Sequence, residues 1–247
     1  MRSCIFCEGR ATSKEDAWPL WLMRRLGATE AGIVEAQRGK QAARTWHSTG
    51  LRVGFVCRNC NSGWMSQLED RVKPIVEGLF DEESVVLDSS AQMALAAWAG
   101  KNAMVYEVLR SEASWFFTNL ERKAMRESLQ LPPVSSVWIA KCVEHAGVYC
   151  KASDLGGFAE VSKDQVKTYV TTMSFGPLAI QVISSKVPSS ISSGTDVMAN
   201  VRLGPWSQVT LQIWPIQSEQ ITWPASMGLS SEFGLETFSE RWSPAKS

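Results

Sequence analysis

Two stretches decide the fold: residues 4–7 read CIFC, and residues 57–80 read CRNCNSGWMSQLEDRVKPIVEGLF. Each contains two cysteines with two residues between them. In a chain of this length, paired cysteines at this spacing are typical of a metal site rather than a disulfide framework. Two such pairs supply four thiolates, the tetrahedral ligand set of a structural zinc ion. The spacing therefore predicts a structural Zn²⁺ site rather than unrelated buried thiols, with the ligands Cys4, Cys7, Cys57 and Cys60.

The residues around the second pair predict a strand that leads into it and a helix that leads out. Apolar residues alternate over 51–57, as in a strand. After Cys60 the apolar residues recur at helical spacing over 64–80, with a kink expected at Pro74. The positive end of that helix favours thiolate over thiol at Cys60. A knuckle, a strand, and a second knuckle that feeds a helix form the layout of a treble clef.

Between the knuckles, the sequence predicts a short helix followed by a loosely ordered loop. The helix is expected over LWLMRRL (20–26), ending at Gly27. Residues 28–50 are small and polar, and they predict an insertion without regular structure.

Beyond residue 80, two helices are expected before a region of strands. The first spans 90–110, with a core stripe of Met93, Ala97, Met104 and Val108. The second begins at Thr118, because Thr118-Asn-Leu-Glu121 has the form of a capping box. Five segments separated by Gly, Pro and Ser then predict strands: 134–143, 147–152, 167–175, 177–184 and 207–215. The fold class predicted is α+β, with a zinc-binding domain over 1–80 and an α+β extension with an antiparallel sheet over 81–247.

Two further cysteines, Cys142 and Cys150, flank a predicted turn at 144–147. We expect them to face each other across a hairpin as buried core thiols. A second metal site formed with His145 is the alternative, and it would require a fourth ligand.

Composition and charge narrow the classes of function. The chain has 247 residues, 45% of them apolar, and no apolar run long enough to span a membrane. Its first residues lack the apolar stretch of a secretory signal, so a cytoplasmic location is expected. The formal net charge is zero, which argues against a uniformly basic surface for nucleic acid. Between Glu35 and Glu69, however, the sequence has no acid, and this stretch is either a solvated loop or a phosphate-contacting surface; its basic residues are Arg38, Lys40, Arg44, Arg52 and Arg58.

Three runs together, CIFC, KEDAWPLWL and CRNCNSGWMSQLE, resemble the zinc-bearing branch of the HNH endonucleases. The pattern of that family is CxxC, then Glu/Asp-His with Pro three positions after the His, then CxxCN at the start of a helix. The resemblance covers about the first 80 residues. It implies a ββα-metal-like treble clef and a nuclease that hydrolyses phosphodiester bonds in DNA with catalytic Mg²⁺ or Mn²⁺.

The resemblance assigns roles to individual residues. Glu15 matches the acid that holds the catalytic metal, and Asn61 matches the metal ligand at the start of the helix. Asp16 stands where the family has its general-base His, and an Asp has a pKa about 2.6 units lower and is a weaker base near neutral pH. His47 is the other candidate for the base, displaced onto the insertion.

Each of these residues also has a purely structural interpretation. Residues 13–16 (SKED) have the form of an N-cap box for the following helix. Asn61 could simply be the N-cap of its helix, and His47 could be an exposed loop residue. The sequence therefore favours a metal-dependent nuclease, and the alternative is a non-catalytic zinc-stabilised module that binds nucleic acid or protein.

Overall fold

The structure is a computed structural model, and it describes residues 2–28, 31–36, 44–47, 52–81, 84–110, 112–144, 147–156, 167–187 and 204–241. Its helices are α1 (Leu20–Leu26), α2 (Arg58–Cys60), the π-helical turn Asn61–Met65, α3 (Ser66–Asp81), α4 (Ser89–Glu107), α5 (Asn119–Ser128) and α7 (Ser231–Glu240). Short 3₁₀ turns lie at Glu112–Ser114 and Gly204–Gln208. The strands are β1 (Ser13–Asp16), β2 (Ala31–Ala36), β3 (Arg44–His47), β4 (Arg52–Val56), β5 (Val85–Asp88), β6 (Ser135–Lys141), β7 (Val148–Gly156), β8 (Lys167–Phe175), β9 (Leu178–Lys186), β10 (Thr210–Trp214) and β11 (Gln220–Trp223). Helices combined with mostly antiparallel sheets confirm the predicted α+β class at this level.

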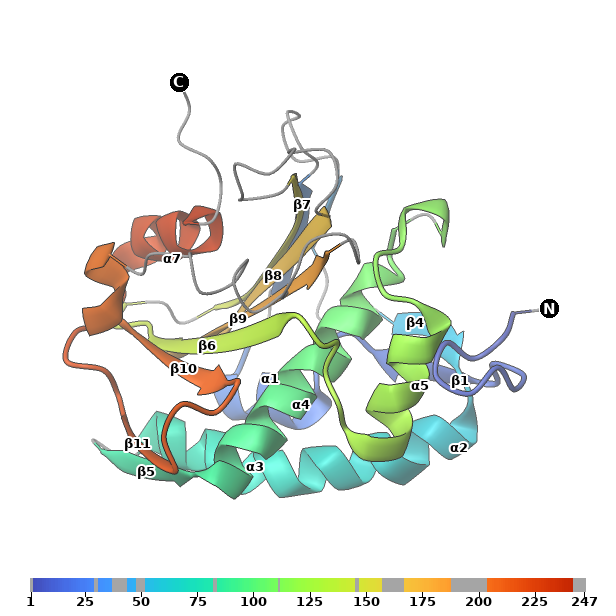
Figure 1. The fold of residues 1–247 in the computed structure, drawn as a ribbon, viewed down its shortest axis with the longest axis horizontal. Helices are drawn as coiled ribbons and strands as arrows, with labels where there is room; N and C mark the ends of the chain where they lie inside the picture. The colour runs from blue at the N-terminus through green and yellow to red at the C-terminus, as the bar shows by residue number, and fades with distance from the viewer. Residues whose placement is uncertain are drawn as a thin grey trace.

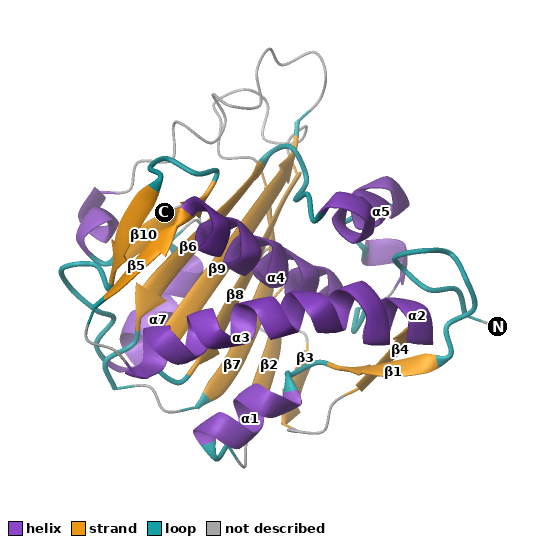
Figure 2. Ribbon diagram, turned by 90° about the horizontal axis from the view of Figure 1, so that it is seen from below, coloured by secondary structure: helices purple, strands orange, loops and turns teal. Residues whose placement is uncertain are grey.

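A seven-stranded sheet is the centre of the molecule, in the order β10-β6-β9-β8-β7-β2-β3. All of its pairs are antiparallel except β2 with β7, which run parallel. Helices α3 and α4 cover one face of the sheet and α7 lies on the other (Figures 1 and 2). Two smaller antiparallel pairs, β1-β4 and β5-β11, flank it.

Helix α4 is the buried axis of the fold. The Asp88 carboxylate caps it by accepting from the Ala91 amide at 2.7 Å. The helix is buried on nearly all sides from Ala94 onward, because the sheet, α3 and α5 all pack on it. The predicted core stripe is confirmed at Ala97, Met104 and Val108 but wrong at Met93, which is 48% exposed in the first turn, outside the sheet contact.

Helix α5 begins as predicted. The Thr118 hydroxyl accepts from the Glu121 amide at 3.2 Å, and the Glu121 carboxylate accepts from the Thr118 amide at 2.7 Å. The helix ends before Leu129, whose φ of 56° takes the backbone into the left-handed region.

Two expectations about the sheet are wrong. Part of the predicted irregular insertion, 28–50, forms β2 and β3, because these segments find pairing partners in the sheet; residues 29–30, 37–43 and 48–50 lie outside the described part of the chain. The predicted hairpin between Cys142 and Cys150 does not form. The tight turn at Gly176, with φ 56°, instead makes a β8-β9 hairpin that inserts between β6 and β7.

Cys142 and Cys150 are nevertheless buried thiols, 3% and 0% exposed, as expected of core residues. His145, the third residue of the alternative metal site, lies outside the described residues. Burial raises the pKa of Cys142 to about 12, and it raises that of Cys150 further.

The boundary expected near Asp81 falls at the end of α3. The segments on its two sides share the seven-stranded sheet and one continuous buried core, which contains Leu22, Val56 and Trp98. The division into 1–80 and 81–247 stays a prediction about folding units. Among the described helices, none has both the length and the apolar character needed to cross a bilayer.

Candidate metal centre and adjacent basic cavity

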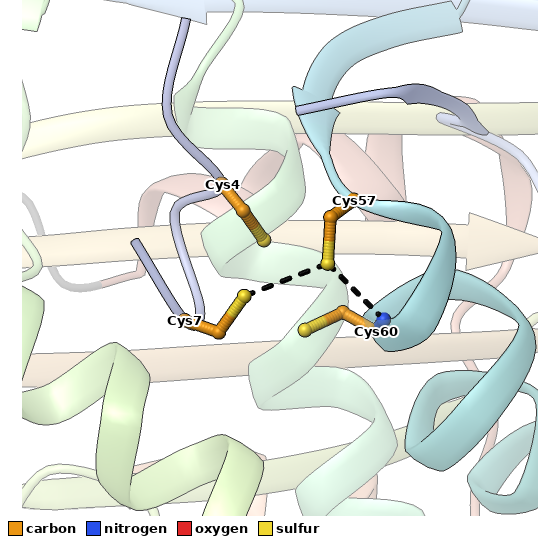
Figure 3. A group of neighbouring side chains, drawn as sticks. All are labelled: Cys4, Cys7, Cys57 and Cys60. Carbon is orange, nitrogen blue, oxygen red and sulfur yellow. Dashed lines mark hydrogen bonds between the residues drawn. The ribbon is translucent and has the colours of Figure 1, made fainter. Parts of the chain in front are cut away.

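The four predicted zinc ligands converge. The Sγ atoms of Cys4, Cys7, Cys57 and Cys60 lie within 4.8 Å of one another, and Figure 3 shows the side chains turned inward from the two knuckles. All four are free thiols, and the sulfurs of Cys7 and Cys57 lie 3.5 Å apart. A zinc tetrahedron with Zn–S bonds of about 2.3 Å has sulfur–sulfur edges of about 3.8 Å. The cluster can therefore hold a metal ion.

The second knuckle is built by the start of a helix. Cys57 is the N-cap of α2 in an extended conformation, and its sulfur accepts a hydrogen bond from the Cys60 amide at 3.4 Å. Strand β4 delivers Cys57, as the sequence predicts. The chain passes through a kink at Gly63, whose backbone is non-helical (φ −98°, ψ −113°), into α3, where Pro74 lies inside the helix.

The first knuckle is attached to the second at two points. The Ile5 amide donates to the Phe55 carbonyl at 3.0 Å, and the Phe6 and Trp64 rings meet edge to face with centroids 5.1 Å apart. Glu8 takes a positive φ of 61°, which closes the turn between Cys7 and Gly9. Ligands distant in sequence are thus brought together by β4 and by the aromatic contact.

The pKa values of the thiols fit a site that needs a cation. Burial, reinforced by the neighbouring Cys4, raises the pKa of Cys60 well above its ordinary value. Burial also raises the pKa of Cys57, but the Cys60 amide and the neighbouring thiols lower it by more. Burial therefore disfavours the thiolate at Cys60, and a bound cation would supply the stabilisation that this thiolate needs.

A cavity of about 500 Å³ adjoins the cysteine cluster. Its lining comes from both knuckles and from α5, with no acidic side chain: Cys7, Gly9, Arg10, Thr12, Cys57, Arg58, Asn59, Cys60, Trp64 and Arg126. Arg10, Arg58 and Arg126 are exposed. Within the described residues, none of these three guanidinium groups has an ion pair or a side-chain hydrogen bond. We call this feature the basic cavity.

The candidate metal-binding acid Glu15 forms a buried ion pair with Lys101. It is 7% exposed, and its carboxylate lies 3.5 Å from the Nζ of Lys101, which is also 3.0 Å from the Glu69 carboxylate. Burial raises the pKa of Glu15, and Lys101 partly counters that rise. Burial lowers the pKa of Lys101, but the two carboxylates more than reverse this effect. The ammonium group therefore takes the position beside these acids that a divalent cation would need.

Asp16, at the position of the general base, points away from Glu15 because adjacent residues of a strand face opposite sides. Its carboxylate accepts from Arg52 Nε at 2.7 Å. The structure thus brings Asp16 and Glu15 into one strand but not into one cluster. The capping-box interpretation of residues 13–16 is wrong, because they form β1 and α1 has Pro19 at its N-cap without a side-chain cap.

Asn61 joins the helix to β1. Its Nδ2 donates to Ser13 Oγ at 2.8 Å and to the Lys14 carbonyl at 3.3 Å. The N-cap interpretation is wrong for Asn61, since Cys57 caps this helix. His47 ends β3, where it is paired with Gly32, and its side chain lies outside the described part of the structure.

The basic stretch 35–69 contributes to the basic cavity through Arg58. Arg38 and Lys40 lie outside the described residues, and Arg52 is paired with Asp16. Arg10 and Arg126, which flank the same cavity, had no sequence signal beyond being basic. The sequence does not indicate the role of Lys101 either, since a lysine in an alanine-rich helix normally faces solvent.

A scan against protein-family models finds no family that matches, and searches of curated proteins and of solved structures find no match either.

Proposed function

We propose that this chain is a zinc-stabilised module that binds nucleic acid through the basic cavity. The observation that carries the proposal is a set of three exposed arginines, whose guanidinium groups have no partners among the described residues, around one concavity next to the four cysteines. Guanidinium groups bind phosphate oxygens through paired hydrogen bonds, and no acid in the lining competes for them. In this proposal the four cysteines hold Zn²⁺ in a treble clef, and four thiolates leave the ion no open position for substrate.

The test is fluorescence anisotropy of labelled oligonucleotides with the zinc-loaded chain. We expect binding that weakens with salt, with a Kd on the order of 10⁻⁴–10⁻⁶ M at physiological ionic strength. Removing the three arginines together (Arg10→Ala, Arg58→Ala, Arg126→Ala) should weaken it by at least about tenfold.

The matched control removes three exposed basic residues outside the cavity (Arg24→Ala, Lys73→Ala, Lys123→Ala) and so changes the net charge equally. If both triple variants bind alike, the attraction is a general charge effect and the assignment to the cavity fails.

The nuclease implied by the resemblance is the second proposal. The observation that favours it is that β1, which carries Glu15 and Asp16, pairs with β4 and is tied by Asn61 to the helix after the second knuckle. Catalysis would require Glu15 to leave Lys101 and Asp16 to leave Arg52, so we rank it below binding.

Plasmid nicking with added Mg²⁺ or Mn²⁺ tests the nuclease, comparing the wild type with Asp16→Ala, Glu15→Ala and His47→Ala. Nicking that is lost in Asp16→Ala and Glu15→Ala would support this site. Nicking that survives both substitutions would exclude a catalytic site at Glu15 and Asp16. If neither metal supports nicking, the nuclease proposal fails and the binding module is favoured.

A further inference from the structure

The basic cavity differs in shape and charge from a surface that follows duplex DNA. Its arginines come from three separate segments, the first knuckle, the second knuckle and α5, and they surround a hollow instead of forming a strip. A volume of about 500 Å³ lies in the range of pockets that enclose a small ligand. Such a concavity admits one nucleotide but not the continuous backbone of a duplex.

The charge of the cavity fits one phosphate group. Four thiolates and one Zn²⁺ carry a net charge of about −2, and the arginines of the basic cavity adjoin that centre. Three guanidinium groups offset this charge and leave an excess of about one positive charge. That excess matches the single negative charge of one phosphodiester group.

The remaining lining supplies groups for a base and a sugar. Trp64 contributes an indole, Asn59 an amide that both donates and accepts, and Thr12 a hydroxyl. Unpaired bases are recognised by aromatic and guanidinium planes together with hydrogen bonds to their edges. Stacking on the Trp64 indole requires a base that is not already stacked and paired in a duplex.

From these observations we infer that the basic cavity holds one nucleotide of a single-stranded nucleic acid, with Arg126 of α5 on its phosphate. This inference rests on the proposed function and deepens it. It also gives the segment after residue 81 a role, because α5 closes a site whose other arginines come from the knuckles.

The experiment compares a labelled single strand of about 12 nucleotides with the duplex of the same sequence, using the zinc-loaded full chain. We expect the single strand to bind at least about tenfold more tightly than the duplex. Substituting Arg126→Ala should weaken single-strand binding about tenfold and reduce the slope of log K against log salt by about 0.7, the contribution of one phosphate of a single strand.

Arg24→Ala is the matched control, since Arg24 is also an exposed helical arginine without a described partner but lies on α1. It should bind both probes like the wild type. Circular dichroism and zinc content of the two variants should equal those of the wild type, which excludes loss of fold as the cause.

The outcomes separate the two proposals. Duplex binding as tight as single-strand binding, or equal effects of Arg126→Ala and Arg24→Ala, overturns the single-nucleotide site and leaves nucleic-acid binding in place. Absence of binding to both probes overturns both proposals.

Discussion

The cysteine cluster and the seven-stranded sheet are held together by different physics. At the knuckles, residues 4–7 and 57–60 meet around four sulfurs that could hold a metal ion. In the sheet region, α4 is enclosed by strands and helices, and Trp98, Met173 and Phe175 are completely buried. A bound metal ion would stabilise the first region, and apolar burial stabilises the second, so conditions that remove one source of stability should leave the other largely intact.

The largest expected effect comes from removing the metal. Binding of structural zinc in zinc-finger peptides contributes about 10–16 kcal/mol, so chelation should unfold the knuckles. In hydrogen exchange, amides of 52–65 should lose protection while those of β8 and β9 keep it. Elemental analysis should find about one zinc per chain before chelation.

The control for this prediction compares two buried cysteines. Cys60→Ser should lose zinc, whereas Cys142→Ser, a buried thiol outside the cluster, should retain it. Equal zinc content in the two variants would contradict the tetrathiolate site.

The next effect concerns the ion pair beneath α5. Arg122 and Glu107 are both fully buried, with Nη2 2.5 Å from Oε2, and Arg122 also donates to the Met104 carbonyl at 3.1 Å. Arg122→Leu leaves a buried carboxylate without its cation and should reduce the free energy of unfolding by about 3–5 kcal/mol. Urea denaturation measures it. Lys123→Ala, on the exposed side of the same helix, should change the free energy of unfolding by less than about 0.5 kcal/mol. If both variants lose the same amount, the buried ion pair does not account for the loss in Arg122→Leu.

A smaller effect should appear with pH. Burial raises the pKa of Glu107 to about 7, although Arg122 and the Phe116 and Phe117 amides oppose the rise. Because the folded chain binds this proton more tightly than the unfolded chain, the stabilisation is complete below about pH 4.5 and falls as pH rises to about 7. At about 1.4 kcal/mol for each pKa unit, the change is about 3 kcal/mol. Urea denaturation across this range should show the decline in the wild type and its loss in Glu107→Gln, while Glu127→Gln, an exposed neighbour, keeps it.

The smallest effect tests the local signal that the sequence gives most clearly. Thr118→Ala removes the hydroxyl that caps α5 and should cost about 1 kcal/mol, whereas Thr118→Ser keeps the cap and most of the stability. Thermal unfolding of both variants measures the difference. Similar losses in the two would mean that the capping bond contributes nothing.

The features predicted correctly are those that depend on a few adjacent residues. The CxxC spacing, the capping box at Thr118 and the strand over 167–175 each depend on local geometry, and the structure reproduces them. The order of the sheet depends instead on pairs far apart in the chain, such as Ala31 with Val148, which no local pattern encodes.

The candidate site shows the same limit. Lys101 neutralises Glu15 and Glu69 only because α3, α4 and β1 pack together, and a single alanine-rich helix does not reveal that contact. Arg126 reaches the basic cavity for a similar reason, since α5 is placed there by tertiary packing. The zinc identity, the nuclease activity and the cytoplasmic location stay predictions.

The parallel pairing of β2 with β7 has a consequence for synthesis on the ribosome. The segment that forms β2 is made long before Val148, and at about 5–20 residues per second the wait is on the order of 10 s. All four cysteines of the cluster emerge well within that interval. A nascent chain could therefore bind a metal ion at the four cysteines while β2 still lacks its neighbour β7.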